Sequence, residues 1–345
     1  MADYATIKKP KDHFNNKLWT GNGSARSITG VGFKPDWVWI KDRDNTRWHQ
    51  LFDAVRGAGK VIYSNATTAE GDDINRLSGF ISDGFSLGTN NNVNDNSQDY
   101  VAWNWKASNA TAVSNSDGDV TSTVSANQTA GFSIVTVSNL NSNSFGHGLG
   151  KEPHLIFGKR TDDVANWRTY FKGISSGKSL FLNVNNAETT EGSAIASANA
   201  TTVTVTGSGN GGSAGTGTAV YYCFAPIRGY SKIGTYTGNN NSDGVFIYTG
   251  FRPAWGMFKR VDSTSDWMIM DDARNGGYRD QPVYKPILAN STAAESSSYA
   301  SYQCDFVSNG FKVRNTLGNQ NASGTYLFMA FAELPLVGDN PAPAR

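Results

Sequence analysis

The sequence predicts an all-β fold built from three tandem β-sandwich modules of jelly-roll-like arrangement. Three observations predict it. A motif of fixed residue order occurs three times along the chain. Short aromatic or alternating segments are separated by Gly- and Asn-rich turns, as in β-sandwiches with a turn about every 8–12 residues. Helical periodicity is nearly absent.

The repeated motif is a Gly, two residues, a Pro, an apolar run, a Lys-rich end and then a Trp. Its prolines are 118 and 100 residues apart, and its tryptophans are 119 and 100 residues apart. The marker residues are Gly32, Pro35 and Trp48; Gly150, Pro153 and Trp167; and Gly250, Pro253 and Trp267. Spacing this regular predicts related modules of about 100 residues, the size of an ordinary domain.

Each module also ends on a similar aromatic segment. The closing segments begin at Tyr100, Tyr221 and Tyr326, which lie 65, 68 and 73 residues after the motif Pro. This drift is what loop insertions between fixed strands produce.

Individual strands and turns can be placed within the modules. Residues 37–40 are aromatic and β-branched, and Pro35 suits the strand entry because Pro cannot donate to a ladder. Residues 79–88 and 304–313 alternate around Asp-Gly and Asn-Gly pairs and predict hairpins. Module two alternates at 201–206 without such a pair, so we expect its hairpin to be shorter or rebuilt. The Asn/Gly-rich runs 90–96, 207–212 and 239–244 are predicted loops.

The predicted organisation follows from these elements. It comprises an N-terminal leader or anchor at 1–16, module one at 17–107, a connector at 108–130, module two at 131–226, module three at 227–336 and a tail at 337–345. The connector is either extended or a hairpin. The short junction between modules two and three predicts a packed interface between them.

Composition narrows the class of protein. The net charge is +1 and the pI is near 7.7, without a basic stripe for nucleic acid. No apolar run approaches the ~20 residues of a membrane span. The first residues lack a signal-peptide core, so we expect synthesis in a cytoplasm without signal-dependent export. Cys223 and Cys304 occupy unlike positions, which predicts two buried, reduced thiols.

Motifs for chemistry are largely missing from the sequence. The histidines show no metal-ligand spacing, and no nucleophile elbow or phosphate loop is present. We therefore expect no catalytic residue and no cofactor, while Asp/Asn-rich loops leave a structural Ca²⁺ open. His147 is interpreted as a surface-loop residue. The acidic pairs 72–73, 162–163 and 271–272 are interpreted as solvated turns, with glycosidase carboxylates or Ca²⁺ ligands as the alternative.

Recurring side chains are candidates for contacts. An exposed Trp48, Trp167 or Trp267 could stack on a sugar, but the apolar alternation that follows each one favours a core or intermodule role. These three tryptophans, with Lys8 and Lys9 of the leader, are the candidate partner or glycan contacts. The recurring motif cations are expected to pair with acidic groups of a neighbouring module or chain; they are Lys41, Arg43, Lys159, Arg160, Lys259 and Arg260.

Seven segments carry a further signal when taken together: 32–43, 80–88, 100–107, 228–239, 249–260, 308–312 and 329–333. They resemble a repeat family found in virion structural and tail proteins of marine tailed bacteriophages. The resemblance spans nearly the whole chain, and module two departs most from the pattern. It carries no catalytic motif.

The resemblance implies a non-catalytic component located in the virion, as a capsid decoration, a head fibre or a tail-associated part. Its implied partners are other capsid or tail proteins and further copies of itself, with a trimer favoured. A host-surface glycan is a further candidate partner, and neither nucleic acid nor membrane insertion is expected. One alternative is a carbohydrate-binding receptor protein of a tail fibre, which predicts tryptophans exposed in a row. Another is a glycan-degrading tailspike, which needs two carboxylates facing across a groove.

Overall fold

The structure is a computed structural model that describes residues 5–141, 143–191, 194–207, 217–275, 281–296 and 301–335. The predicted tail, residues 1–4 of the leader and positions 208–212 of a predicted loop lie outside these ranges. Almost every regular element is a strand in an antiparallel sheet, which confirms the all-β prediction. Among the described residues no helix is long and apolar enough to span a membrane.

The elements fall into three successive groups. The first contains β1 (Phe14–Thr20), β2 (Arg26–Thr29), β3 (Trp37–Asp42), β4 (Gln50–Asp53), β5 (Lys60–Val61), β6 (Gly71–Asp72), β7 (Leu77–Ile81), β8 (Gly84–Leu87) and β9 (Asp99–Trp105). The second contains β10 (Val113–Asn115), β11 (Ser122–Asn127), β12 (Phe132–Ser138), β13 (Ser144–Gly146), β14 (Leu155–Arg160), β15 (Arg168–Phe171), β16 (Lys178–Phe181), β17 (Thr189–Thr190), β18 (Ala194–Ala198), β19 (Thr202–Thr206) and β20 (Thr218–Phe224). The third contains β21 (Ser231–Gly238), β22 (Phe246–Tyr248), β23 (Phe251–Arg260), β24 (Met268–Asp271), β25 (Ile287–Leu288), β26 (Cys304–Val307), β27 (Gly310–Val313) and β28 (Gly324–Pro335). Within the described ranges, the helical elements are one turn of α-helix and two 3₁₀ turns: α1 (Asn91–Asn94), η1 (Pro10–Asp12) and η2 (Ala273–Asn275).

The same strand order occurs three times. The large sheets run β1-β9-β3-β4, β12-β20-β14-β15 and β21-β28-β23-β24, with extra strands at the edges of the second and third. The small sheets run β2-β8-β7, β13-β19-β18 and β22-β27-β26. We call each large sheet with its small sheet module one, two or three in chain order. The residue boundaries given above for the modules stay predictions.

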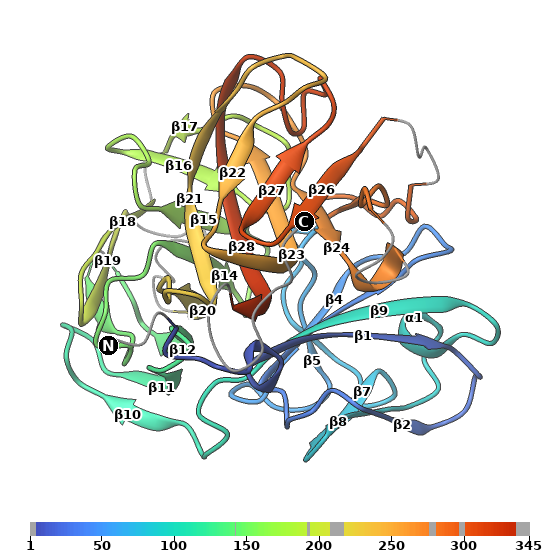
Figure 1. Cartoon of the computed structure of the whole chain (residues 1–345). Helices are drawn as coiled ribbons and strands as arrows, with labels where there is room; N and C mark the ends of the chain where they lie inside the picture. The colour runs from blue at the N-terminus through green and yellow to red at the C-terminus, as the bar shows by residue number, and fades with distance from the viewer. Residues whose placement is uncertain are drawn as a thin grey trace.

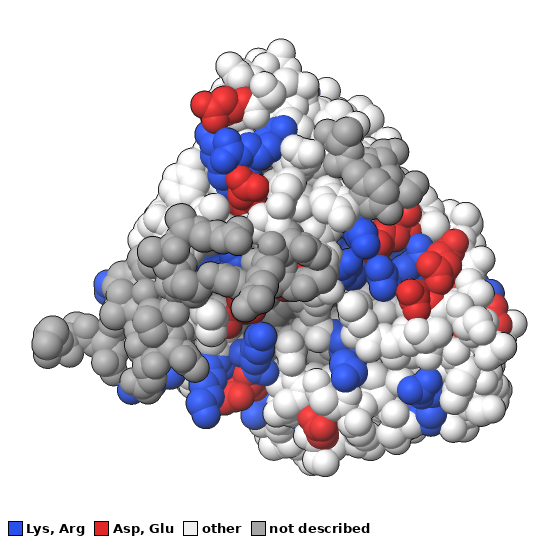
Figure 2. Space-filling model, turned by 45° about the vertical axis from the view of Figure 1, so that its right-hand side comes forward, with Lys and Arg blue, Asp and Glu red and all other residues white. Residues whose placement is uncertain are grey.

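Alternation along the strands gives each large sheet two apolar faces. On β3, Val38 and Ile40 enter a core shared with the small sheet of module one, whereas Trp37 and Trp39 enter a second core. That second core draws residues from all three large sheets. The modules therefore surround a common interior, visible in Figure 1 as blue, green and orange-red groups about one centre. The face in Figure 2 has a triangular outline with mixed charges.

The middle of the common core is a triangle of rings. Trp105, Phe224 and Phe331 hold the same position on β9, β20 and β28, opposite the start of the motif strands. Their ring centroids are 6.4, 6.1 and 5.7 Å apart. An approximate threefold axis therefore passes between them.

Most local predictions hold, and three are refined. The hairpins β7–β8 and β26–β27 are confirmed. The module-two hairpin, β18–β19, is rebuilt around Asn199, whose Oδ1 accepts from the N–H groups of Thr201 and Thr202. The connector forms the hairpin β10–β11 and extends the large sheet of module two. The predicted loop 90–96 contains α1, because the Asn90 side chain caps its first turn.

The leader packs against the body. Ile7 and Phe14 belong to the common core, and β1 begins at Phe14, inside the predicted leader range. The Phe14 ring stacks on Phe331 of module three with centroids 4.9 Å apart. The start of the described chain thus joins modules one and three.

Candidate functional site

Backbone hydrogen bonds link the three modules in a cycle. In each module a glutamate near the end of a long loop donates its N–H to the carbonyl just beyond a motif strand of the next module. The bonds run from Glu70 to Thr161 at 2.8 Å, from Glu188 to Val261 at 2.9 Å and from Glu295 to Arg43 at 2.8 Å. The last bond returns from module three to module one, so the cycle is closed.

A second cycle of hydrogen bonds runs in the opposite direction. Trp167 Nε1 donates to the Tyr63 carbonyl at 2.8 Å, and Trp267 Nε1 donates to the Phe181 carbonyl at 2.8 Å. Both tryptophans are buried. The third member is His49, whose Nε2 lies 3.1 Å from the Leu288 carbonyl.

The strand register corrects the alignment of the first module. Trp39, Phe157 and Met257 of the motif strands pair with Leu51, Thr169 and Ile269. The residues two positions earlier are His49, Trp167 and Trp267, so the equivalent of the two tryptophans is His49 and not Trp48. The two prolines Pro35 and Pro153 are 118 residues apart, and the residue 118 positions before Trp167 is His49. The alignment of Trp48 with Trp167 rested on residue type and not on this spacing.

His49 is a neutral hydrogen-bond link. Its Nδ1 receives the indole N–H of Trp39 at 2.8 Å, so the hydrogen must sit on Nε2 and point to the Leu288 carbonyl. Complete burial, with the nearby charge of Lys41, lowers the pKa of His49 well below its ordinary value. The module one–three contact therefore uses an uncharged imidazole where the other contacts use indoles.

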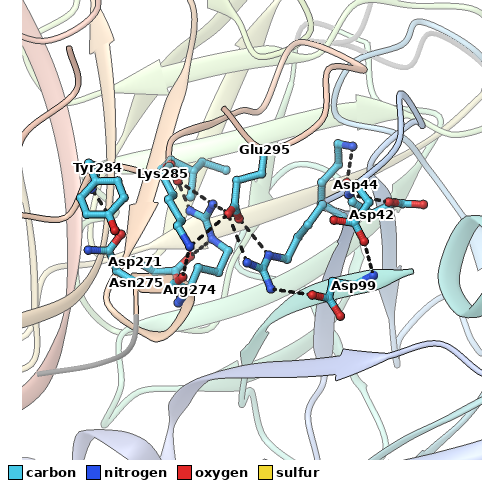
Figure 3. Close-up of polar contacts among 12 residues, drawn as sticks. Asp42, Asp44, Asp99, Asp271, Arg274, Asn275, Tyr284, Lys285 and Glu295 are labelled. Atoms are coloured by element: carbon cyan, nitrogen blue, oxygen red, sulfur yellow. Dashed lines mark hydrogen bonds and ion pairs between the residues drawn. The ribbon is translucent and has the colours of Figure 1, made fainter. Parts of the chain in front are cut away.

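The contact between modules three and one is reinforced by an ion-pair network, the polar centre drawn in Figure 3. The Glu295 carboxylate accepts from Arg43 of module one at 2.8 and 3.1 Å and from Arg274 at 3.0 Å. Burial by itself would raise the pKa of Glu295, but these guanidinium groups hold that pKa below its ordinary value. Glu295 thus stays charged between two cations.

Arg274 also joins a fully buried pair. Its Nε lies 2.7 Å from Oδ2 of Asp271, and that oxygen also accepts the indole N–H of Trp103 from module one at 2.9 Å. Neither Asp271 nor Arg274 exposes its side chain. A buried charge is tolerated only when it is paired and hydrogen-bonded, as both charges are here.

Modules one and two repeat this arrangement. Arg56 Nε lies 2.5 Å from Asp53 Oδ2, which accepts the hydroxyl of Tyr222 from module two at 2.7 Å. Arg56 also contacts Glu70 at 2.8 Å, as Arg274 contacts Glu295. The pKa of Arg56 is raised: burial, the largest single effect, opposes its charge, but the charges of Asp53, Tyr222 and Glu70 and the hydrogen bond to Glu70 together outweigh burial.

Modules two and three replace the polar arrangement by an apolar one. The positions of the buried Asp and Arg hold Phe171 and Ile174, and the counterpart of Tyr222 and Trp103 in module three is Met329. Phe171 and Met329 are buried in the common core, and Ile174 packs against it. Glu188 here accepts instead from the Ser175 hydroxyl at 2.6 Å. One fold position therefore tolerates either a paired ion or a hydrophobic contact.

Three buried lysines occupy equivalent positions on the motif strands. Lys159 Nζ donates to the carbonyl of Thr67 in module one at 3.3 Å, and Lys259 Nζ to that of Asn185 in module two at 3.4 Å. Burial lowers the pKa of Lys41 and of Lys159 to about 8 and that of Lys259 to about 7. Lys159 and Lys259 therefore bind backbone carbonyls of the preceding module, whereas Lys41 Nζ donates to the Asp42 and Asn45 carbonyls of its own module.

The predicted pairing of the motif cations is confirmed in part. Arg43 pairs across a module boundary with Glu295. Arg160 and Arg260 instead pair locally, with Asp162 at 2.9 Å and Asp262 at 2.7 Å. Arg160 and Arg260 are the last residues of their motif strands, and each pairs with the carboxylate two residues later, in the exposed turn that follows.

The candidate contact residues divide by exposure. Trp167 and Trp267 are buried between modules, so they are withdrawn as partner or glycan contacts because they present no ring to the surface. Trp48 is 41% exposed. Lys8 and Lys9 are exposed in front of η1. A row of three exposed tryptophans is therefore not present.

Two interpretations of polar residues were wrong. His147 is buried, with Nε2 3.1 Å from the Asn199 carbonyl, because the rebuilt hairpin covers it. Asp271 and Asp272 are buried rather than in a solvated turn. Burial, then the charges of Glu333 and Asp271, raise the pKa of Asp272 well above its ordinary value, and its carboxyl bonds to Glu333. The carboxyl groups of Asp272 and Glu333 are hydrogen-bonded to each other, unlike the two carboxylates of a glycosidase, which face each other across a groove.

The remaining candidate chemistry is sparse. Both Cys223 and Cys304 are free and buried, as predicted. Over the ranges that the structure describes, no three His, Cys, Asp or Glu side chains gather as metal ligands.

Comparison with known proteins identifies a family for the chain. Neither the curated proteins nor the solved structures contain a match to the chain. A family model described as "Domain of unknown function (DUF7483)" matches residues 9–335, which include all three modules. The chain therefore belongs to the DUF7483 family.

Proposed function

We propose that the protein is a non-catalytic structural component of a bacteriophage virion, attached to the capsid or the tail. The observation that carries the proposal is the closed cycle of intermodule bonds. Glu70, Glu188 and Glu295 make it in one direction, and His49, Trp167 and Trp267 in the other. It joins three β-modules into one body with a shared aromatic core. A single body with one shared core suits a protein that must keep its shape on the outside of a particle.

The resemblance of the repeated segments to virion proteins supports a location in the virion. Side chains that could serve chemistry are used in holding modules together: Asp53 with Arg56, and Asp271 with Arg274. The partners we propose are other capsid or tail proteins. The homotrimer stays a prediction. A single chain already provides three modules in an approximately threefold arrangement, so this arrangement by itself does not require three chains.

The test is to purify particles of the phage that encodes the chain and to obtain an averaged electron cryo-microscopy map. We expect the chain in the purified particles and density into which the triangular body fits, on the capsid lattice or on the tail. Presence in the lysate together with absence from the purified particles would overturn the proposal.

The oligomeric state is measured separately. Light scattering after size exclusion distinguishes a single 37.1 kDa chain from a homotrimer. Either result is compatible with a virion location, so this measurement tests the predicted trimer alone.

A further inference from the structure

Trp48 is the exception among the tryptophans. Of the nine in the chain, eight are buried, and Trp48 is 41% exposed. A single exposed apolar residue is ordinary on a protein surface. Trp48, however, forms one wall of a pocket of 270 Å³. The lining residues are Thr46, Arg47, Trp48, Gln50, Tyr63, Arg76 and Asn92.

The aromatic wall of this pocket is held in place by the protein itself. The Trp48 ring meets Tyr63 edge to face, with centroids 4.9 Å apart and an interplanar angle of 71°. Gln50 Nε2 donates to the Trp48 carbonyl at 3.0 Å. Arg76 donates to the Tyr63 hydroxyl at 3.1 Å and lies over the Tyr63 ring at 5.6 Å. A ligand would therefore meet a preformed surface and would not have to order it.

The charges around the pocket are already compensated. Arg47 pairs with Asp42 at 3.1 Å and with Asp95 at 2.6 Å. Arg76 pairs with Asp73 at 3.1 Å. The pocket is thus lined by a partly exposed indole and by polar side chains, with little net charge.

We propose that this pocket binds a neutral sugar ring of a saccharide, stacked on the Trp48 indole. A pyranose has an apolar C–H face that matches an aromatic ring and hydroxyls that match polar groups around it. Thr46 and Asn92 also line the pocket, and a hydroxyl and an amide are groups that can hydrogen-bond to those hydroxyls. An anionic sugar is disfavoured because the nearby guanidinium groups are paired.

The site belongs to module one alone. The positions equivalent to Trp48 hold Asn166 and Asp266, each just before an interface tryptophan. Of these three equivalent positions in the described part of the chain, one therefore carries an indole. The inference goes beyond the proposed structural role and does not depend on it.

The experiment is saturation-transfer NMR on the full chain. The probes are neutral oligosaccharides built from glucose, galactose, mannose and N-acetylhexosamines, with uronic-acid oligosaccharides as the charged comparison, all at millimolar concentration. We expect transfer to at least one neutral sugar ring. Trp48→Ala should weaken that binding about tenfold or more, as loss of a central aromatic anchor does, and Trp48→Phe should retain part of it. The matched controls are Asn166→Ala and Asp266→Ala, which should leave binding unchanged.

Three results would overturn the inference: no Trp48-dependent signal with any neutral probe, binding by the charged probes alone, or unchanged binding in a folded Trp48→Ala variant. A protein partner that is captured through Trp48 in place of a saccharide would overturn it as well. None of these results bears on whether the chain is found in particles, so the structural proposal is tested independently.

Discussion

Trp167 and Trp267 combine two roles at a module boundary, because each fills space and donates a hydrogen bond to the neighbouring module. Trp167→Ala removes a buried ring and leaves the Tyr63 carbonyl without its donor. We expect a loss of about 3–5 kcal/mol in the free energy of unfolding, measured by urea denaturation. Trp48→Ala, at an exposed ring, should cost under about 1 kcal/mol. Similar losses for the two variants would contradict the assignment of Trp167 to the interface.

Lys259 makes stability depend on pH in a predictable direction. Its pKa is about 7 in the folded protein and near 10.5 when unfolded, so between these values the unfolded chain binds more protons. Stability should therefore rise with pH above about 7, by about 1.4 kcal/mol per pH unit for one full proton. The rise is measured by urea denaturation from about pH 6 to 9.

The variant Lys259→Met should lose the part of this slope that belongs to one proton. Below about pH 7 it should show its largest gain in stability relative to the natural chain, since there it removes a buried charge. Lys151→Met, which makes the same substitution at an exposed lysine, is the control. Parallel pH profiles for the natural chain and Lys259→Met would refute a neutral Lys259 above pH 7.

Single residues were the level at which prediction from sequence was weakest. The apolar alternation favoured a core or intermodule role for Trp167 and Trp267 over a role as surface contacts, and both side chains are buried between modules. The motif alignment paired them with Trp48 because identity of residue type was weighted above spacing. The equivalent residue, His49, has a different side chain that makes the same kind of hydrogen bond, so only strand register could find it.

At the scale of elements, hairpin β7–β8 depends on a glycine. Gly84 has φ +148°, and a Cβ there would collide with the carbonyl oxygen of Ile28 on β2. Gly84→Ala should cost about 2 kcal/mol or more and should raise hydrogen exchange across β2, β7 and β8. Gly79→Ala in the same hairpin has open space at its Cβ and should change stability by less than about 1 kcal/mol. An equal effect of both substitutions would sink this explanation.

Strands and hairpins were predictable because they depend on local patterns. The alternation in 79–88 and 304–313 reports burial on one face, and Asp-Gly and Asn-Gly report the turn. The buried pairs Asp53–Arg56 and Asp271–Arg274 were not predictable in the same way. Their partners, Tyr222 and Trp103, come from another module, and the corresponding position in module two is apolar. Sequence spacing cannot show that such distant residues meet.

At the scale of the whole molecule, the common core predicts a single folding unit. Trp105, Phe224 and Phe331 come from three different modules, and removing any module would uncover the other rings. We expect the full chain to melt in one transition, with calorimetric and van't Hoff enthalpies that agree. A fragment comprising residues 131–226 should fail to fold and should bind a hydrophobic dye. Separate transitions, or a folded fragment, would show that the modules are independent.

The covalent joining of three modules in one chain has a genetic consequence. In a homotrimer, one codon change alters the same position in all three subunits. A substitution that is useful in one subunit must therefore be tolerated in the other two. Here each place has its own codon. Position 48 can carry an exposed indole while its counterparts, 166 and 266, carry small polar groups. One boundary can be apolar while two are ionic. The chain keeps the geometry of a trimer while each of its three sides is free to specialise.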